Sequence, residues 1–121
     1  SVSSTNSANV VLPAGAVIFE IQANCAATGG TTPTFDMGFT LYGTSTATDT
    51  GLVSAAVATT GKLVLNQASA TAGANLGTTM STTKLVTITG GGTSGDAPTG
   101  GTITGTILYY VVDPLAGQQN V

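Results

Sequence analysis

The sequence has no histidine and no tryptophan, and it has very little charge. Its charged residues are two cations and five acids, which give a formal net charge of −3. They are Lys62, Lys84, Glu20, Asp36, Asp49, Asp96 and Asp113. Histidine general-base catalysis, histidine metal sites and bidentate arginine recognition of phosphate are therefore outside its chemistry. Two isolated lysines cannot form the cationic surface that binds a phosphate backbone, so we expect no nucleic-acid partner and no enzyme.

The sequence also gives no sign of an intramolecular disulfide or of a membrane-spanning helix. Cys25 is the single cysteine, which excludes an intramolecular disulfide framework. The longest nearly apolar stretch, Val10–Phe19, is interrupted by Pro13 and Gly15 and has about half of the ~20 residues that a spanning helix needs. No signal-peptide pattern is visible either. We therefore expect no membrane partner, and stability that comes from packing, hydrogen bonds or association.

Small side chains dominate what is present. Glycine, alanine, serine and threonine make up 66 of the 121 residues, while 41% of the chain is hydrophobic. The length fits one domain, and the apolar residues occur in organised runs, which indicates a folded chain. Residues Ser1–Asn9 are small and polar, and we interpret them as an N-terminal arm. We expect the domain to span residues 10–113 and a loose tail to span residues 114–121.

Three segments alternate between apolar and polar residues with the period of a β-strand. In Val17–Cys25 one face holds Val17, Phe19, Ile21, Ala23 and Cys25. A second segment places Phe35, Met37, Phe39 and Leu41 on one face, with Asp36 opposite. The third, Thr102–Asp113, becomes apolar on both sides in its second half, which predicts burial of both faces there. Pro114 should end this strand.

Shorter strand candidates complete the pattern. They are Leu52–Ala58, Lys62–Asn66 and Lys84–Thr89, and the loops between strands are Ala26–Thr34, Gly43–Gly51, Gln67–Thr79 and Gly90–Gly101. The sequence therefore predicts an all-β fold, an antiparallel β-sandwich or jelly roll of about six to eight strands with no significant helix.

Two sequence features imitate reactive sites. Gly90–Gly95 has the spacing G-x-G-x-x-G, but Asp96, Ala97 and Pro98 lead into another strand and not into a phosphate-binding helix. We interpret it as a hairpin loop. Cys25 has no histidine to activate it and shares the apolar face of its strand, so we expect an inert core thiol.

The acidic residues are weak candidates for a catalytic carboxylate pair or a calcium site. No two acids lie within ten residues of each other, and Glu20 and Asp36 fall on polar strand faces, where solvated charges are expected. A calcium site using Thr48–Thr50 or Asp96 stays open, although the dense EF-hand spacing is missing. Tyr109 is expected in the core and Tyr110 at the strand edge, with a carbohydrate or partner surface as the alternative. We predict no catalytic, cofactor-binding or metal-binding residue and no cofactor.

The segment Leu12–Ile18, which reads LPAGAVI, leads into an alternating strand and then into Phe35–Gly38. Together with the Gly43-Thr44 turn and the apolar strand Thr106–Val112, this pattern resembles small structural proteins of tailed bacteriophages. The resemblance covers most of the chain and implies an all-β fold, a non-enzymatic role, and a place in the head shell, tail or fibre. It implies no particular contact residue, because acidic residues are nearly missing from the central strand region.

These features together predict a virion structural protein. The expected role is a capsid decoration (cement) protein on the capsid surface, with the major capsid protein and copies of itself as partners, in a homo-oligomer such as a trimer. The alternative is a phage tail or fibre protein, or an extracellular adhesin or filament subunit, with Gly43–Gly51 and Gly90–Gly101 as contact loops. A glycosidase-like enzyme is a weaker third hypothesis.

Overall fold

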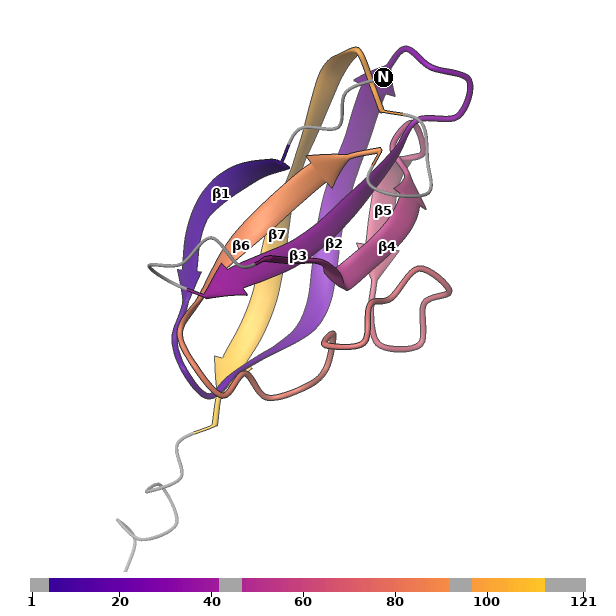
Figure 1. Ribbon diagram of the computed structural model, residues 1–121. Coiled ribbons are helices and arrows are strands. Elements are labelled where there is room, and N and C mark those ends of the chain that lie inside the picture. The colour runs from indigo at the N-terminus through magenta and orange to yellow at the C-terminus, as the bar shows by residue number, and fades with distance from the viewer. Residues whose placement is uncertain (1–4, 42–46, 92–96, 113–121) are drawn as a thin grey trace, which may run out of the picture.

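The computed structural model describes residues 5–41, 47–91 and 97–112, and this part of the chain consists of β-strands and connections without a helix (Figure 1). The strands are β1 (Thr5–Leu12), β2 (Ala16–Thr28), β3 (Thr34–Leu41), β4 (Ala47–Val57), β5 (Gly61–Leu65), β6 (Lys84–Gly90) and β7 (Gly100–Val111). The prediction of an all-β fold without significant helix is confirmed. The Ala-rich segment Gln67–Thr79 is irregular, as its two glycines indicated.

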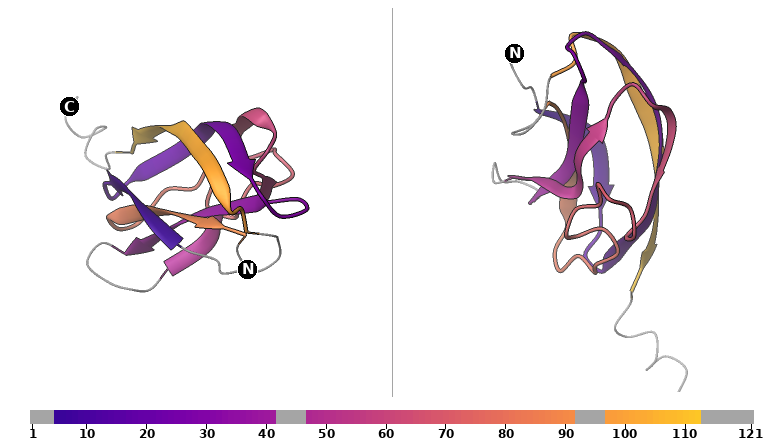
Figure 2. Two further views of the ribbon diagram at one scale, coloured as in Figure 1. Left: turned by 90° about the horizontal axis from the view of Figure 1, so that it is seen from above. Right: turned by 90° about the vertical axis from the view of Figure 1, so that its right-hand side faces the viewer.

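The strands form two antiparallel sheets that face each other as a sandwich (Figure 2). One sheet has four strands in the order β1-β6-β3-β4, and the other has three in the order β5-β2-β7. Every pair of consecutive strands lies in different sheets except β3 and β4. Antiparallel neighbours that are distant in sequence therefore hold both sheets together.

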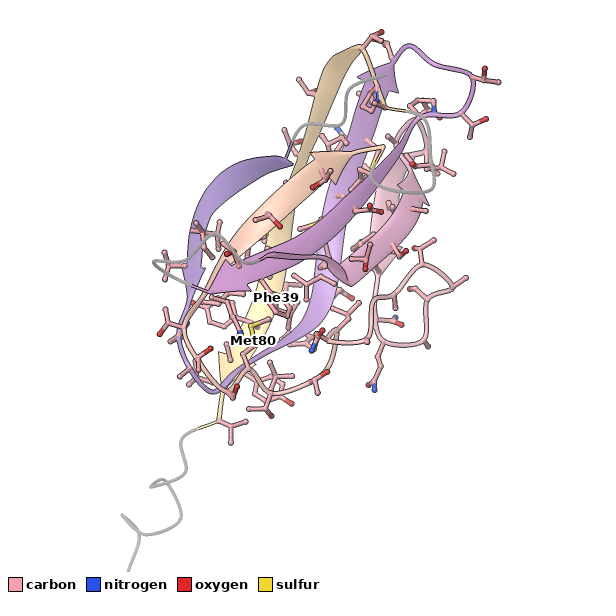
Figure 3. The ribbon with its side chains drawn as sticks, viewed as in Figure 1. Phe39 and Met80 are labelled. Carbon is pink, nitrogen blue, oxygen red and sulfur yellow. The ribbon has the colours of Figure 1, made fainter. Side chains whose placement is uncertain are left out.

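The core lies between the sheets and is built from the inward residues of β2, β3, β4 and β6. Its fully buried side chains include Ile18, Ile21, Phe35, Leu52 and Val86. Phe39 from β3 and Met80 from the β5–β6 connection belong to the same cluster and lie toward the lower end of the sandwich (Figure 3). The connection thus closes one end of the core.

A β-bulge corrects the predicted faces of β2. Ile18 pairs with Tyr109 and Glu20 pairs with Leu108, which leaves Phe19 as an extra residue without a partner across the ladder. The bulge reverses the alternation, so Ile18 is fully buried while Phe19 is 46% exposed. The prediction that Phe19 shares the inner face with Ile21 is therefore wrong.

The first strand begins inside the segment interpreted as an arm. Thr5–Leu12 forms β1, and Thr5 pairs with Thr89 of β6. Backbone pairing with β6 fixes this segment, whose sequence shows no strand-like alternation in residues 5–9. Similarly, β4 starts at Ala47, within the loop expected at Gly43–Gly51. The predicted tail, residues 114–121, lies outside the described residues.

Candidate interaction surface

The structure separates the residues that could have supported catalysis. Cys25 is 2% exposed in the core, and burial raises the pKa of its thiol, which disfavours the thiolate. Glu20 lies in the three-stranded sheet and accepts a 2.8 Å hydrogen bond from Gln22 Nε2. Asp36 lies in the other sheet, so these two acids do not form a pair.

Asp36 differs most from its expected environment. Its side chain is 2% exposed, not solvated, and its Oδ1 accepts a 2.7 Å hydrogen bond from the backbone N–H of Ala55. Ala55 has a positive φ of 55°, and the register of β4 against β3 shifts on both sides of Met37. Asp36 therefore holds an irregular stretch of β4 in place, which is a structural role.

The predicted loop sites are only partly covered by the structure. The side chains of Thr48 and Asp49 and all of residues 92–96 lie outside what it describes, so the calcium hypothesis stays a prediction. Gly90 ends β6, and the next described element is the strand β7. In the described ranges, no group of three or more His, Cys, Asp or Glu side chains could hold a metal ion. The same ranges contain no helix long and apolar enough to cross a membrane.

The four edge strands of the sandwich differ in how well they resist added strands. The ladder of β1 shifts register between Ser7 and Val11, β4 shifts twice, and β5 has only five residues and carries Lys62. Bulges, short length and lysine are devices that discourage edge-to-edge pairing. Three of the four edges therefore carry such protection.

The fourth edge strand, β7, has no such protection against pairing with another strand. This strand has 12 residues, none of them charged, and within the described chain it pairs only with β2. The extra residue of the β2–β7 ladder, Phe19, belongs to β2, so β7 continues past it without an insertion. An uncharged strand without an inserted residue and with one free side is a template for another strand.

An apolar groove runs beside this free edge. It has a volume of about 520 Å³ and opens between the two sheets, where β1 and β7 border it. Its lining includes Val10, Ile21, Met37, Ile88, Ile103 and Ile107. Because one sheet has four strands and the other three, the groove lies where a further strand next to β7 would place its inward side chains.

The end of β7 is exposed, which corrects the prediction that both of its faces are buried there. Tyr109 is 44% exposed at the groove, not in the core, and Tyr110 is 53% exposed on the opposite face. Val111 and Val112 are also almost half exposed. Within the described residues, β7 has no neighbouring strand on its free side, and the Tyr110 face is the outer face of the sandwich. Alternation along a strand shows which side chains share a face, but not whether anything covers that face.

Comparison of the chain with protein-family models, curated proteins and solved structures finds no match. Its function is therefore inferred from β7, the groove beside it and the outer face of the three-stranded sheet.

Proposed function

We propose that this protein is a non-enzymatic structural subunit, a decoration protein on the head shell of a tailed bacteriophage. The observation that carries the proposal is the free, uncharged 12-residue edge of β7. The partners are the major capsid protein and further copies of this chain. The resemblance of Leu12–Ile18 and its neighbouring segments to phage structural proteins, which belong to the head shell, tail or fibre, supports a role in the virion.

The edge supplies a physical mechanism for assembly. An extended segment of a neighbouring subunit that pairs with β7 gains main-chain hydrogen bonds, and its alternate side chains enter the 520 Å³ groove. The lack of charge on β7 means that no charged side chain there has to be desolvated. On a symmetric shell many such contacts act together, so each can be modest.

The test uses purified protein and empty expanded heads in a co-sedimentation assay. Wild type should saturate the heads, and Thr104→Lys/Thr106→Lys on β7 should weaken binding about tenfold or more, because lysines obstruct strand addition. The control, Thr59→Lys/Thr82→Lys, adds the same charge at two exposed positions away from β7. Failure of the wild type to sediment with heads would refute the decoration role. Equal loss in both double variants would refute the role of the edge.

The groove also favours a second candidate, a filament or adhesin subunit. If the strand that enters the groove comes from the next identical subunit, the contact is head-to-tail and continues into a fibre. Sedimentation velocity and electron microscopy of the isolated protein separate the two candidates. Open filaments formed without heads would favour the filament subunit, while a monomer or closed oligomer that binds heads would favour the decoration protein.

A further inference from the structure

The outer face of the three-stranded sheet carries two exposed aromatic rings. The ring centroids of Phe19 and Tyr110 lie 5.9 Å apart with an angle of 30° between the planes. The β2 bulge brings Phe19 to this face, and both side chains are about half exposed, at 46% and 53%. Together they form a tilted apolar platform that lies open to solvent.

A shallow hollow of about 330 Å³ adjoins the platform. Besides the two rings it is lined by Val17, Asn66, Gln67, Ala68 and Gly77, so its polar side chains are amides and its small residues leave space. None of the lining residues is charged. Its volume lies at the lower end of the range of about 300–1,000 Å³ that small-molecule sites occupy.

Hydrogen bonds fasten the loop that forms this hollow. The backbone N–H of Gly77 donates to the Ile18 carbonyl at 2.8 Å, and Asn66 Oδ1 accepts from the Ala68 N–H at 2.9 Å. At Gly77, where φ is 84°, an added Cβ would lie 2.8 Å from Gln67 Oε1. The glycine therefore leaves room for the Gln67 amide at the hollow, and the site exists before any ligand binds.

A second hollow, of about 450 Å³, lies farther along the same sheet. Its lining includes Gln22, Asn24 and Thr104 as hydrogen-bonding side chains, and Gly105, which has no side chain to fill the space. Lys62 is its one charged residue. The two hollows share the strands β2 and β7, so an extended ligand could occupy both.

We propose that this face binds a neutral oligosaccharide, with one sugar ring stacked on Phe19 and Tyr110. A sugar ring has an apolar C–H face that suits an aromatic surface, and hydroxyl groups that suit amide and threonine side chains. The uncharged lining of the first hollow offers nothing to pair with a charged ligand. This binding goes beyond the proposed assembly role, because the two rings and the first hollow share no residue with the groove.

The test is an NMR titration of the ¹⁵N-labelled full chain with cellohexaose, maltohexaose and chitohexaose, and with oligogalacturonate as the anionic comparison. At least one neutral probe should shift the amide signals around Phe19, Gly77 and Tyr110. Tyr110→Ala and Phe19→Ala should each weaken that binding about tenfold. The matched control is Tyr109→Ala, which removes a similarly exposed ring from the opposite face of the same strand.

Four outcomes would overturn the proposal. The first is that no neutral probe shifts the amide signals at millimolar concentration, and the second is that oligogalacturonate binds with the same affinity as the neutral probes. The third is that Tyr109→Ala weakens binding as much as Tyr110→Ala does. The fourth is that amide signals of this face broaden with protein concentration and recover in Tyr110→Ala. The last would mean that a second copy of the chain covers the face. Thermal unfolding of each variant identifies a loss of fold, and head binding, measured separately, remains a test of the decoration role alone.

Discussion

The two sheets share one composition but present opposite outer faces. On the four-stranded sheet, Asp36, Thr87 and Thr89 point away from the core and are nevertheless buried, with at most 5% exposure. On the three-stranded sheet, Phe19, Val64 and Tyr110 are about half exposed. The difference shows that one domain can have a closed outer face with a buried acid and an open outer face with exposed aromatic rings. The four-stranded sheet therefore has a closed outer face, and the three-stranded sheet has an open one.

The edge strands β4 and β7 also differ between the two sheets. In the four-stranded sheet, β4 carries inserted residues against β3 and is anchored through Asp36, whereas β7 in the other sheet carries no inserted residue against β2. Natural edge strands usually carry protection against pairing, so an unprotected edge of this length is expected where pairing has a use.

The largest difference in the free energy of unfolding is expected between two aromatic substitutions, one in each sheet. Phe35 is fully buried in the four-stranded sheet, and Phe35→Ala should lower the free energy of unfolding by about 3–5 kcal/mol. Tyr110→Ala, on the open face, should lower it by less than about 1 kcal/mol. Urea denaturation followed by circular dichroism measures both. Similar losses in the two variants would mean that the faces do not differ as described.

A smaller loss is expected at Asp36. Asp36→Ala should cost about 1–3 kcal/mol, because it leaves the Ala55 N–H without its acceptor in the buried site. Asp36→Asn keeps an acceptor oxygen and should cost less. Glu20→Ala, which changes an acid of the open sheet, should stay within about 0.5 kcal/mol of wild type. The same denaturation experiment applies, and an Asp36→Ala variant as stable as Glu20→Ala would remove the anchoring role of Asp36.

The smallest expected effect is a gain in stability, at Ala55. Ala55 has a φ of 55°, a left-handed conformation that costs an L-residue about 1–2 kcal/mol, and glycine adopts it freely. After the entropy cost of glycine, Ala55→Gly should stabilise the protein by about 0.5 kcal/mol. Ala56→Gly, at the buried neighbour without a positive φ, should destabilise it. The melting temperatures of the pair give the sign of each effect, and a loss at both positions would contradict the strain at Ala55.

The alternation in the sequence was sufficient to predict the fold class and the central strands. Ile21 and Cys25 face the core as their spacing indicated, and so do Phe35, Met37 and Phe39. The bulge at Phe19 could not be predicted in this way, because one inserted residue exchanges the faces without changing the composition. The strand β1 was missed because its pairing with β6 fixes it, and that pairing is non-local.

The candidate surface was less predictable than the fold. Tyr110 was expected at a strand edge, but the exposure of Tyr109 depends on β7 being outermost in its sheet. Asp36 looked like a solvated acid because its partner, Ala55, is 19 residues away in the chain. Strand order and long-range hydrogen bonds decide both cases, and neither leaves a local pattern in the sequence.

The ladder between β2 and β7 also has a mechanical consequence. It holds 12 residue pairs, and the Val112 N–H extends it with a 2.8 Å hydrogen bond to Gly15 O, where β1 turns into β2. The strand β1 begins toward the upper end of the sandwich and β7 finishes at the lower end (Figure 1). Tension applied between Thr5 and Val112 would act on the β1–β6 ladder, which has five pairs and a register shift, in series with the β2–β7 ladder. Since forced unfolding follows the barrier of the step that fails, β1 should detach from β6 first, while the longer β2–β7 ladder stays paired.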